Sequence, residues 1–298
     1  MPWIQLRIPA DSDTADQLED LLMALGADAV SMEDAADEPL FEPDPGTTPL
    51  WQATRVTGLF DAGRDIEQLC SEIRDAWHQQ TQQSLAEIDI ELVEDKDWAR
   101  AWMEDFKPLK FGERLWIVPS WHEPPDPDAA NLSLDPGLAF GTGTHATTAM
   151  CLEWLDEHPI AGRQVIDYGC GSGILGLAAL LLDARHVIGV DTDPQALEAS
   201  RDNARRNGVP DDRLDLYLPG EEPELQADVM LANILAQPLI MLAPKLAAKV
   251  LPRGDLVLSG ILAHQAREVM AAYEPWFVMD EPEQRDEWIR LTGRRRDR

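Results

Sequence analysis

The chain has 298 residues, 44% hydrophobic and 27% charged, which is typical of soluble globular proteins. Because this length exceeds that of one usual hydrophobic core, two domains are expected. The formal net charge of -30 repels a polyphosphate backbone, so direct nucleic-acid recognition is not expected and basic partners are favoured. Adaptation to a high-salt habitat explains the same acidity, so charge alone does not decide the function.

Three widely spaced cysteines, Cys70, Cys151 and Cys170, form no CxxC pair. The pattern predicts neither a disulfide framework nor a zinc site, and no metal is expected. No apolar stretch reaches the roughly 18 residues of a spanning helix, and the first residues lack the order of a signal peptide. We therefore expect a cytoplasmic protein without a membrane partner.

Residues 1–95 predict a small α+β domain with the element order β-α-β-β-α-β. This is the ferredoxin-like order, which recurs in recognition modules. The apolar positions that support it are Ile4, Leu6 and Ile8; Leu18, Leu21, Leu22 and Leu25 before Gly26; Val30 and Met32; Trp51 to Phe60; Ile66, Leu69, Ile73 and Trp77; and Ile88, Ile90 and Leu92. We expect this domain to recognise the substrate.

Residues 96–125 are expected to form a linker helix and a connecting segment. Trp98, Trp102 and Phe106 stand four residues apart on one helical stripe, which Pro108 ends. Aromatic side chains at this spacing usually pack in a core, so the stripe does not predict a platform for stacking bases.

Residues 126–298 alternate strands with helices. Continuous apolar strands are expected at residues 165–167, 187–191, 229–233 and 256–259, each followed by a helix. Such strands belong to a sheet covered on both faces. The pattern therefore predicts a doubly wound, mostly parallel, Rossmann-like α/β sheet.

A glycine-rich turn, Asp167-Tyr168-Gly169-Cys170-Gly171-Ser172-Gly173, follows the first of these strands. Glycines allow a ligand to approach the backbone, and the helix that follows offers free N–H groups. The segment from Gly171 to Gly176 also fits GxGxxG, so a nicotinamide dehydrogenase is the alternative. Asp167 favours a methyltransferase, because an acid can meet the amine of a methionine moiety but repels a pyrophosphate.

Asp191 ends the next strand, where a carboxylate can accept both hydroxyls of a ribose. The alternative is a helix cap before Pro194. Upstream, the glycine- and threonine-rich residues 135–148 can bond to the methionine end of a cofactor, or form a capped turn. Within that loop, His145 is a candidate proton acceptor, although a lone loop histidine is more often structural.

Asn233 ends the strand at residues 229–233 and offers an acceptor oxygen to an incoming amine. Methyltransferases that act on planar amino groups usually carry Asn-Pro-Pro-aromatic at this place. Here Ile234, Leu235 and Ala236 follow the asparagine, which favours an aliphatic amine.

Together these segments resemble the ribosomal protein L11 methyltransferase family over nearly the whole chain. The resemblance rests on the two tryptophans of the linker and on FGTGTHATT, VIDYGCGSG, GVDTDP and ANIL, and it is most specific from Phe140 to Asn233. It implies a class I methyltransferase fold with S-adenosylmethionine as cofactor. The implied reaction methylates lysine side chains and the α-amino group of a basic large-subunit ribosomal protein, free or on the ribosome, which the amino-terminal domain holds.

The resemblance also implies the site. The positions expected to contact the cofactor are Thr148, Gly169, Gly171, Gly173, Asp191 and Asn233, and Asn233 is also the expected catalytic residue. The acidic loop from Asp34 to Pro49 is not matched to the family pattern, and no substrate contact is assigned to it.

Three other functions stay open at this point. A dehydrogenase needs a His or a Tyr-Lys pair for hydride transfer, and none is convincingly spaced. A small-molecule methyltransferase does not need residues 1–95. A non-catalytic module for ribosome assembly that retains a cofactor pocket fits the same sequence.

Overall fold

The computed structural model describes residues 2–36, 53–85, 87–93, 106–135 and 145–297. The chain divides into two compact units, Met1–Asp105 and Phe106–Arg298, and each is described by itself. The predicted linker stripe at Trp98 and Trp102, the acidic loop and most of the loop at residues 135–148 lie outside the described residues.

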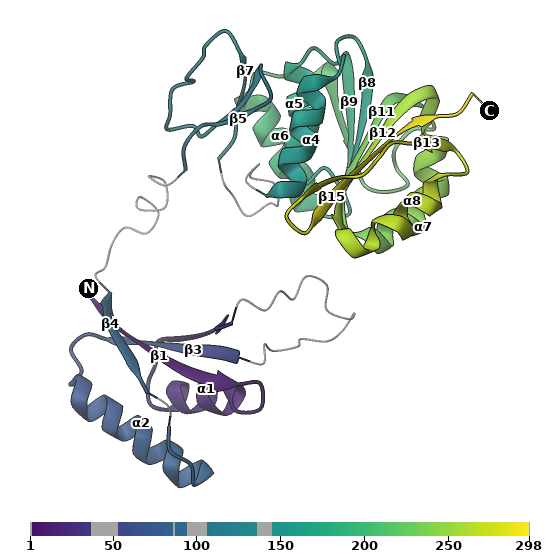
Figure 1. The fold of residues 1–298 in the computed structure, drawn as a ribbon. Coiled ribbons are helices and arrows are strands. Elements are labelled where there is room, and N and C mark those ends of the chain that lie inside the picture. The colour runs from purple at the N-terminus through teal and green to yellow at the C-terminus, as the bar shows by residue number, and fades with distance from the viewer. Residues whose placement is uncertain (1, 37–52, 86, 94–105, 136–144, 298) are drawn as a thin grey trace. The chain divides into compact units, whose positions relative to one another are not determined.

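The N-terminal unit is a four-stranded antiparallel sheet with two helices (Figure 1). Its elements are β1 (Trp3–Asp11), α1 (Ala15–Ala24), β2 (Ala29–Asp34), β3 (Ala53–Asp61), α2 (Ile66–Thr81) and β4 (Asp89–Val93). The strand order is β2-β3-β1-β4. The chain order β-α-β-β-α-β and this strand order are consistent with the ferredoxin-like class predicted for the segment.

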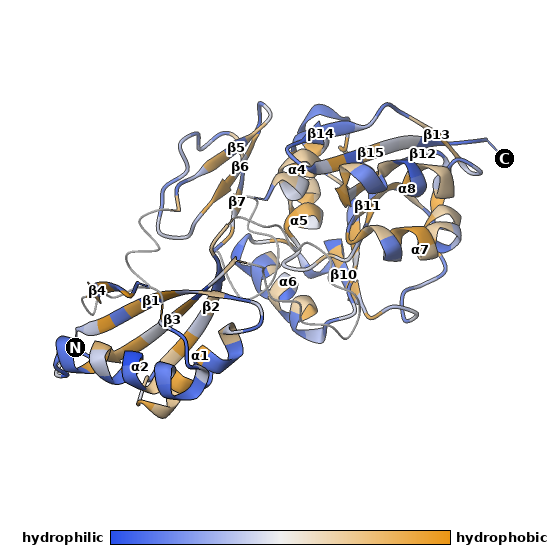
Figure 2. Cartoon of the chain, turned by 60° about the horizontal axis from the view of Figure 1, so that its bottom comes forward, coloured by the Kyte–Doolittle hydropathy of each residue, from blue (hydrophilic) through white to orange (hydrophobic). Residues whose placement is uncertain are grey.

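Alternation along β1 explains the core of this unit. Ile4, Leu6 and Ile8 are fully buried with Leu18 and Leu22 of α1, because successive side chains of a strand point to opposite faces of the sheet. The strands of this sheet carry many hydrophobic residues, whereas α1 and α2 are hydrophilic on one side and apolar on the other (Figure 2). The helices therefore cover one face of the sheet.

The C-terminal unit is built on an eight-stranded mixed sheet. Its elements are β5 (Leu109–Phe111), β6 (Leu115–Val118), β7 (Ala130–Ser133), α4 (Ala146–Glu157), β8 (Gln164–Tyr168), α5 (Ile174–Leu181), β9 (His186–Val190), α6 (Pro194–Arg206), β10 (Leu214–Tyr217), β11 (Ala227–Asn233), α7 (Ala236–Ala248), β12 (Val250–Leu262), α8 (Ala266–Tyr273), β13 (Phe277–Met279), β14 (Glu283–Arg285) and β15 (Trp288–Arg295).

The strand order of this sheet is β10-β9-β8-β11-β12-β15-β13, with β14 paired to β15. The first five strands are parallel, and β15 pairs antiparallel with both β12 and β13. Apolar side chains of α4 and α5 fill one face and those of α7 and α8 fill the other. The predicted doubly wound, mostly parallel sheet is confirmed; β10 and β13 to β15 were not predicted.

A separate three-stranded sheet, β5-β6-β7, precedes α4. Leu115, Ile117 and Leu132 are buried in the same cluster as the apolar side chains of α4 and α5. Residues 106–125, part of the segment 96–125 predicted as a linker helix and connecting segment, thus lie in the C-terminal unit. Strands β5 and β6 belong to the C-terminal unit, because their apolar side chains complete its core.

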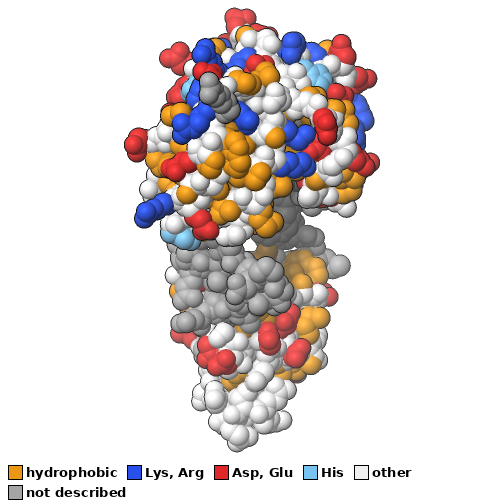
Figure 3. Space-filling view, turned by 90° about the vertical axis from the view of Figure 1, so that its right-hand side faces the viewer, with side chains coloured by type: hydrophobic (Ala, Val, Ile, Leu, Met, Phe, Trp, Pro, Cys, Tyr) orange, Lys and Arg blue, Asp and Glu red, His pale blue; other side chains and the backbone are white. Residues whose placement is uncertain are grey.

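The surface of the C-terminal unit carries both signs of charge. On the face shown in Figure 3, Lys and Arg side chains stand among acidic and apolar ones. No helix within the described residues is both long and apolar enough to cross a bilayer.

Candidate active site

The glycine turn after β8 adopts the backbone that its sequence predicts. Gly169, Gly171 and Gly173 all have positive φ values, of 82°, 53° and 80°, which L side chains rarely adopt. A Cβ atom on Gly169 would lie 2.2 Å from Cγ2 of Ile234. The turn therefore requires glycine both for its conformation and for the close approach of the segment after β11.

Side chains of α6 form hydrogen bonds to the backbone of this turn. Oγ of Ser200 donates to the Gly171 carbonyl at 2.8 Å, and Nδ2 of Asn203 donates to the Ser172 carbonyl at 2.9 Å. A Cβ atom on Gly173 would lie 2.9 Å from the Ser200 hydroxyl. These contacts direct the Gly171 and Ser172 carbonyls toward α6.

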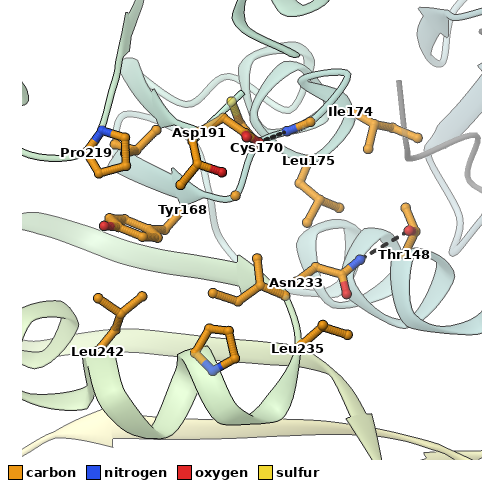
Figure 4. A pocket seen from close by; sticks show the side chains of 16 residues that line it. Thr148, Tyr168, Cys170, Ile174, Leu175, Asp191, Pro219, Asn233, Leu235 and Leu242 are labelled. Carbon is orange, nitrogen blue, oxygen red and sulfur yellow. Dashed lines mark hydrogen bonds between the residues drawn. The ribbon is translucent and has the colours of Figure 1, made fainter. Parts of the chain in front are cut away.

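A cavity of about 470 Å³ opens beside the turn, at the carboxyl ends of β8, β9 and β11. Its volume falls within the usual range for small-molecule sites. The lining residues are Thr148, Tyr168, Gly169, Cys170, Gly171, Ile174, Leu175, Val190, Asp191, Thr192, Pro219, Asn233, Ile234, Leu235, Pro238 and Leu242. Figure 4 shows Tyr168, Pro219 and Leu242 at one end and Thr148 and Asn233 at the other.

Asp191 lies between these ends and is bonded to the backbone. Oδ2 accepts the N–H of Gly171 at 2.8 Å, and Oδ1 accepts the N–H of Asp193 at 3.0 Å. A carboxylate has about four lone-pair sites, so it can accept further hydrogen bonds from a ligand. The helix cap before Pro194 is Asp193, whose carboxylate accepts the N–H of Gln195, so the capping alternative does not apply to Asp191 itself.

Asn233 and Thr148 meet at the opposite end of the cavity. Nδ2 of Asn233 lies 3.2 Å from Oγ1 of Thr148, which is buried in the first turn of α4. In Figure 4 the amide oxygen of Asn233 points away from Thr148, and no described residue donates to it. The end of β11 therefore carries an amide oxygen that accepts no hydrogen bond from the residues that the structure describes.

Asp167 does not line the cavity, contrary to the expected contact with an amine. Along β8 the side chains of Ile166 and Tyr168 join the cluster under α7 and α8, so Asp167 points to the other face of the sheet. There its Oδ2 accepts the N–H of Gly176 at 2.9 Å, and it is 1% exposed. Burial raises the pKa of Asp167 to about 7, the bond from Gly176 lowers it in part, and the charge of Asp191 raises it.

His145 is the N-cap of α4. Its Nδ1 lies 2.8 Å from Oγ1 of Thr147, and its ring stands edge-on to Trp288 at 4.9 Å between centroids. The structural alternative for His145 is therefore supported, since the residue organises the start of the helix that carries Thr148.

Comparison with known proteins adds the family to this geometry. A family model described as ribosomal protein L11 methyltransferase (PrmA) matches residues 2–296. A curated ribosomal protein L11 methyltransferase of Marinobacter nauticus is 80% identical over 297 residues, 100% of both chains. The chain belongs to the ribosomal protein L11 methyltransferase family.

Two further relatives support the same family. A protein of the same name from Pseudomonas aeruginosa is 56% identical over 296 residues, 99% of each chain. The solved structure of the ribosomal protein L11 methylase of Lactobacillus delbrueckii subsp. bulgaricus is 32% identical, with a TM-score of 0.58, and covers 64% of this chain and 100% of that chain. The resemblance stated from the motifs is confirmed, and the dehydrogenase alternative is set aside.

The structure brings five of the six expected cofactor-site residues of this family member to one cavity: Thr148, Gly169, Gly171, Asp191 and Asn233. Gly173 does not line it, because it packs against α6 as the N-cap of α5. Sequence analysis missed the apolar end at Tyr168, Pro219 and Leu242. Only Tyr168, which lies within the glycine motif itself, carried a signal that could have pointed there.

Proposed function

We propose that this enzyme transfers methyl groups from S-adenosylmethionine to lysine side-chain and α-amino groups of the large-subunit ribosomal protein L11, free or on the ribosome. The observation that carries the proposal is the full-length family match. A substrate of this kind places the enzyme in the cytoplasm, and direct recognition of nucleic acid is not part of the proposal.

The cavity offers each part of S-adenosylmethionine a matching surface. Asp191 would accept the ribose hydroxyls, and the turn at Gly169 and Gly171 leaves room for the ligand against the backbone. Thr148 and Asn233 provide polar groups for the methionine end. When bound, the cofactor supplies an electrophilic methyl group on a sulfonium.

Asn233 is assigned to the nucleophilic amine. In-line displacement requires a neutral nitrogen held roughly 3 to 3.5 Å from the methyl carbon. The amide oxygen of Asn233, which points away from Thr148, can accept an N–H of the amine and so direct its lone pair. This orientation matters most in the transition state, where the attacking angle is fixed.

The proton of the substrate amine leaves to water in this proposal. A lysine with a pKa near 10.4 is neutral in only about four molecules per ten thousand at pH 7. Among the described residues that line the cavity, Asp191 is the single carboxylate and there is no histidine or lysine. Asp191 is engaged by the N–H groups of Gly171 and Asp193. Desolvation near a fixed positive charge lowers the pKa of the bound amine.

The N-terminal unit is assigned to selecting the protein substrate. Residues 1–95 form the recognition domain, residues 96–125 connect it, with β5 and β6 packed on the unit that follows, and residues 126–298 carry the methyltransferase site. A small-molecule methyltransferase has no need of such a domain.

A turnover assay with labelled S-adenosylmethionine and purified L11 tests the proposal. Label in L11 at lysine and at the α-amino group, found by mass mapping, is the expected result. Label transfer to a small amine but not to L11 contradicts the substrate assignment. Binding of L11 and cofactor without any transfer supports the non-catalytic assembly module instead.

A further inference from the structure

A buried carboxylate lies just outside the cavity, in the loop between β10 and β11. The side chain of Glu222 is 4% exposed, and its Oε1 lies 2.8 Å from Nζ of Lys245 and 3.5 Å from Nζ of Lys249. The N–H of Gly220 donates to its other oxygen. Lys245 lies in the last turn of α7 and Lys249 is the C-cap of that helix, so Glu222 ties this loop to the C-terminal end of α7.

Lys245 has a second partner. Its Nζ lies 3.1 Å from the hydroxyl oxygen of Tyr168 and 5.3 Å from the centre of the Tyr168 ring. An ammonium group only donates, so the Tyr168 oxygen accepts and its own proton is directed elsewhere. The charge pair, in which Glu222 is buried and Lys245 is partly exposed, therefore fixes the rotation of the Tyr168 ring and the position of its hydroxyl.

These contacts surround the apolar end of the cavity. Pro219 comes from the loop that carries Glu222, Leu242 comes from α7, and the Tyr168 ring lies between them (Figure 4). Asp191 and Asn233 occupy the polar remainder of the cavity. A flat, weakly polar adenine ring fits the apolar end, where it can pack on an aromatic side chain.

We propose that Lys245 and Glu222 are positioning residues for the adenine end of the cofactor site. Lys245 fixes the Tyr168 ring, which forms one wall of the adenine pocket. Glu222 fixes Lys245 by its ion pair and links the loop that carries Pro219 to α7. This inference rests on the proposed function, since it assumes S-adenosylmethionine in this cavity. It goes beyond the motif residues, because neither Lys245 nor Glu222 lines the cavity.

The charge states required for this arrangement hold over the working range of pH. Burial raises the pKa of Glu222, but the bonds from Lys245 and the backbone outweigh it and lower the pKa to about 2. Burial lowers the pKa of Lys245, and the bonds to Glu222 and Tyr168 outweigh it, so the net direction is upward. The pair is therefore charged throughout, and its effect on binding should not vary between about pH 6 and 9.

The direct test is Lys245→Met, with the binding of S-adenosylhomocysteine and of adenosine measured by calorimetry. We expect both ligands to bind about tenfold more weakly, and by the same factor, as for the loss of a charge-assisted contact. The rate constant at saturating S-adenosylmethionine should stay within about twofold of wild type, because the reacting end is untouched. Lys245→Arg, which keeps the charge and donors, should recover most of the affinity.

Lys249→Met is the matched control, since Lys249 bonds to Glu222 but not to Tyr168. It should change the affinity by less than about twofold. Because Lys245 acts through Tyr168, the losses of the two single variants should not add. The double variant Lys245→Met/Tyr168→Phe should bind S-adenosylhomocysteine no more weakly than whichever single variant has the lower affinity.

Three results would overturn the inference: wild-type affinity in Lys245→Met, equal losses in Lys245→Met and Lys249→Met, or single-variant losses that multiply in the double variant. A wild-type enzyme that binds neither S-adenosylhomocysteine nor adenosine would instead refute the proposed cofactor. The two failures are therefore distinguishable. Thermal unfolding of each variant shows whether the fold is intact, and a folded Lys245→Met protein gives a decisive answer either way.

Discussion

The two units of the chain differ in charge and in what their sheets support. Residues 1–105 hold 25 acidic and six basic side chains, a net charge of -19, whereas residues 106–298 hold 30 and 19, a net charge of -11. The net negative charge per residue is roughly three times as large in the N-terminal unit as in the C-terminal unit. The cavity at the sheet edge belongs wholly to the less acidic unit. The negative charge is thus concentrated in the unit that does not contain the cavity.

The sheets of the two units also differ in how helices cover their faces. Helices cover both faces of the parallel strands in the C-terminal unit, so the ends of those strands are rigidly placed. In the N-terminal unit α1 and α2 pack on one face, while the other carries polar side chains such as Gln5 and Arg7, which pairs with Glu91 at 2.8 Å. A sheet covered on both faces suits precise positioning of a small ligand, and a polar sheet face suits recognition of a protein.

The largest effect on the chemistry is expected from Asn233→Ala, which removes the acceptor proposed for the amine. The rate constant should fall by about 10² to 10³, as for loss of one preorganised transition-state contact, while binding of L11 is unchanged. Steady-state kinetics measure this. Gln237→Ala, an exposed amide at the start of α7, is the control and should leave the rate unchanged. Wild-type turnover in a stable Asn233→Ala protein would remove Asn233 from the mechanism.

A pH-dependent effect on stability should be confined to the C-terminal unit. Because the pKa of Asp167 is raised to about 7, the folded state keeps the proton while the unfolded state loses it near pH 4. Its contribution is full below about pH 4 and is lost as pH rises to about 7. Asp167→Asn mimics the protonated form, so it should gain on the order of 4 kcal/mol relative to wild type between pH 4 and 8.

Denaturant unfolding at several pH values tests this. The two proteins should unfold alike at pH 4 and diverge as the pH rises. A constant difference across the range would show that Asp167 is ionised in the folded protein at all these pH values.

Asp191→Ala should weaken the binding of S-adenosylhomocysteine by about 1.5 to 3 kcal/mol, the range for hydrogen bonds to a charged group. Asp193→Ala separates this from a capping effect, since it should cost about 1 kcal/mol of stability and leave the affinity unchanged. Calorimetry and thermal unfolding supply the two readouts. Equal affinity losses in both variants would mean that Asp191 acts only through the backbone of the loop.

The smallest expected effect concerns the acidic unit. If its net charge of -19 attracts a basic partner, the association rate with L11 should fall by about tenfold as salt rises from about 0.05 to 0.5 M. Stopped-flow binding measures this rate. Activity that stays flat or rises over the same range would favour adaptation to a high-salt habitat.

Sequence patterns predicted the site best where one physical rule was sufficient. Asp191 directly follows β9 and Asn233 ends β11, and the ends of parallel strands share one edge of the sheet, so their proximity followed from the strand assignments. The same alternation that buries Ile166 and Tyr168 turns Asp167 to the opposite face. That rule was available from the sequence, and it was not applied to Asp167.

Other features depend on contacts between distant segments. β10 has only Leu214 and Leu216 as alternating apolar residues, and both are partly exposed at the sheet edge, so its pattern is weak. The adenine end joins Tyr168, Pro219 and Leu242 from three elements, and its support by Glu222 and Lys245 spans 23 positions of the sequence. Neither periodicity nor a local motif predicts such an assembly.

The division of labour between the two units is tested most directly with the fragment that begins at Phe106. It should bind S-adenosylhomocysteine within about threefold of the full chain, since the cavity and its supports lie in residues 106–298. Methylation of L11 by the fragment should be at least about 100-fold slower than by the full chain, because the recognition unit is missing. A fragment that methylates L11 at the full rate would contradict the account.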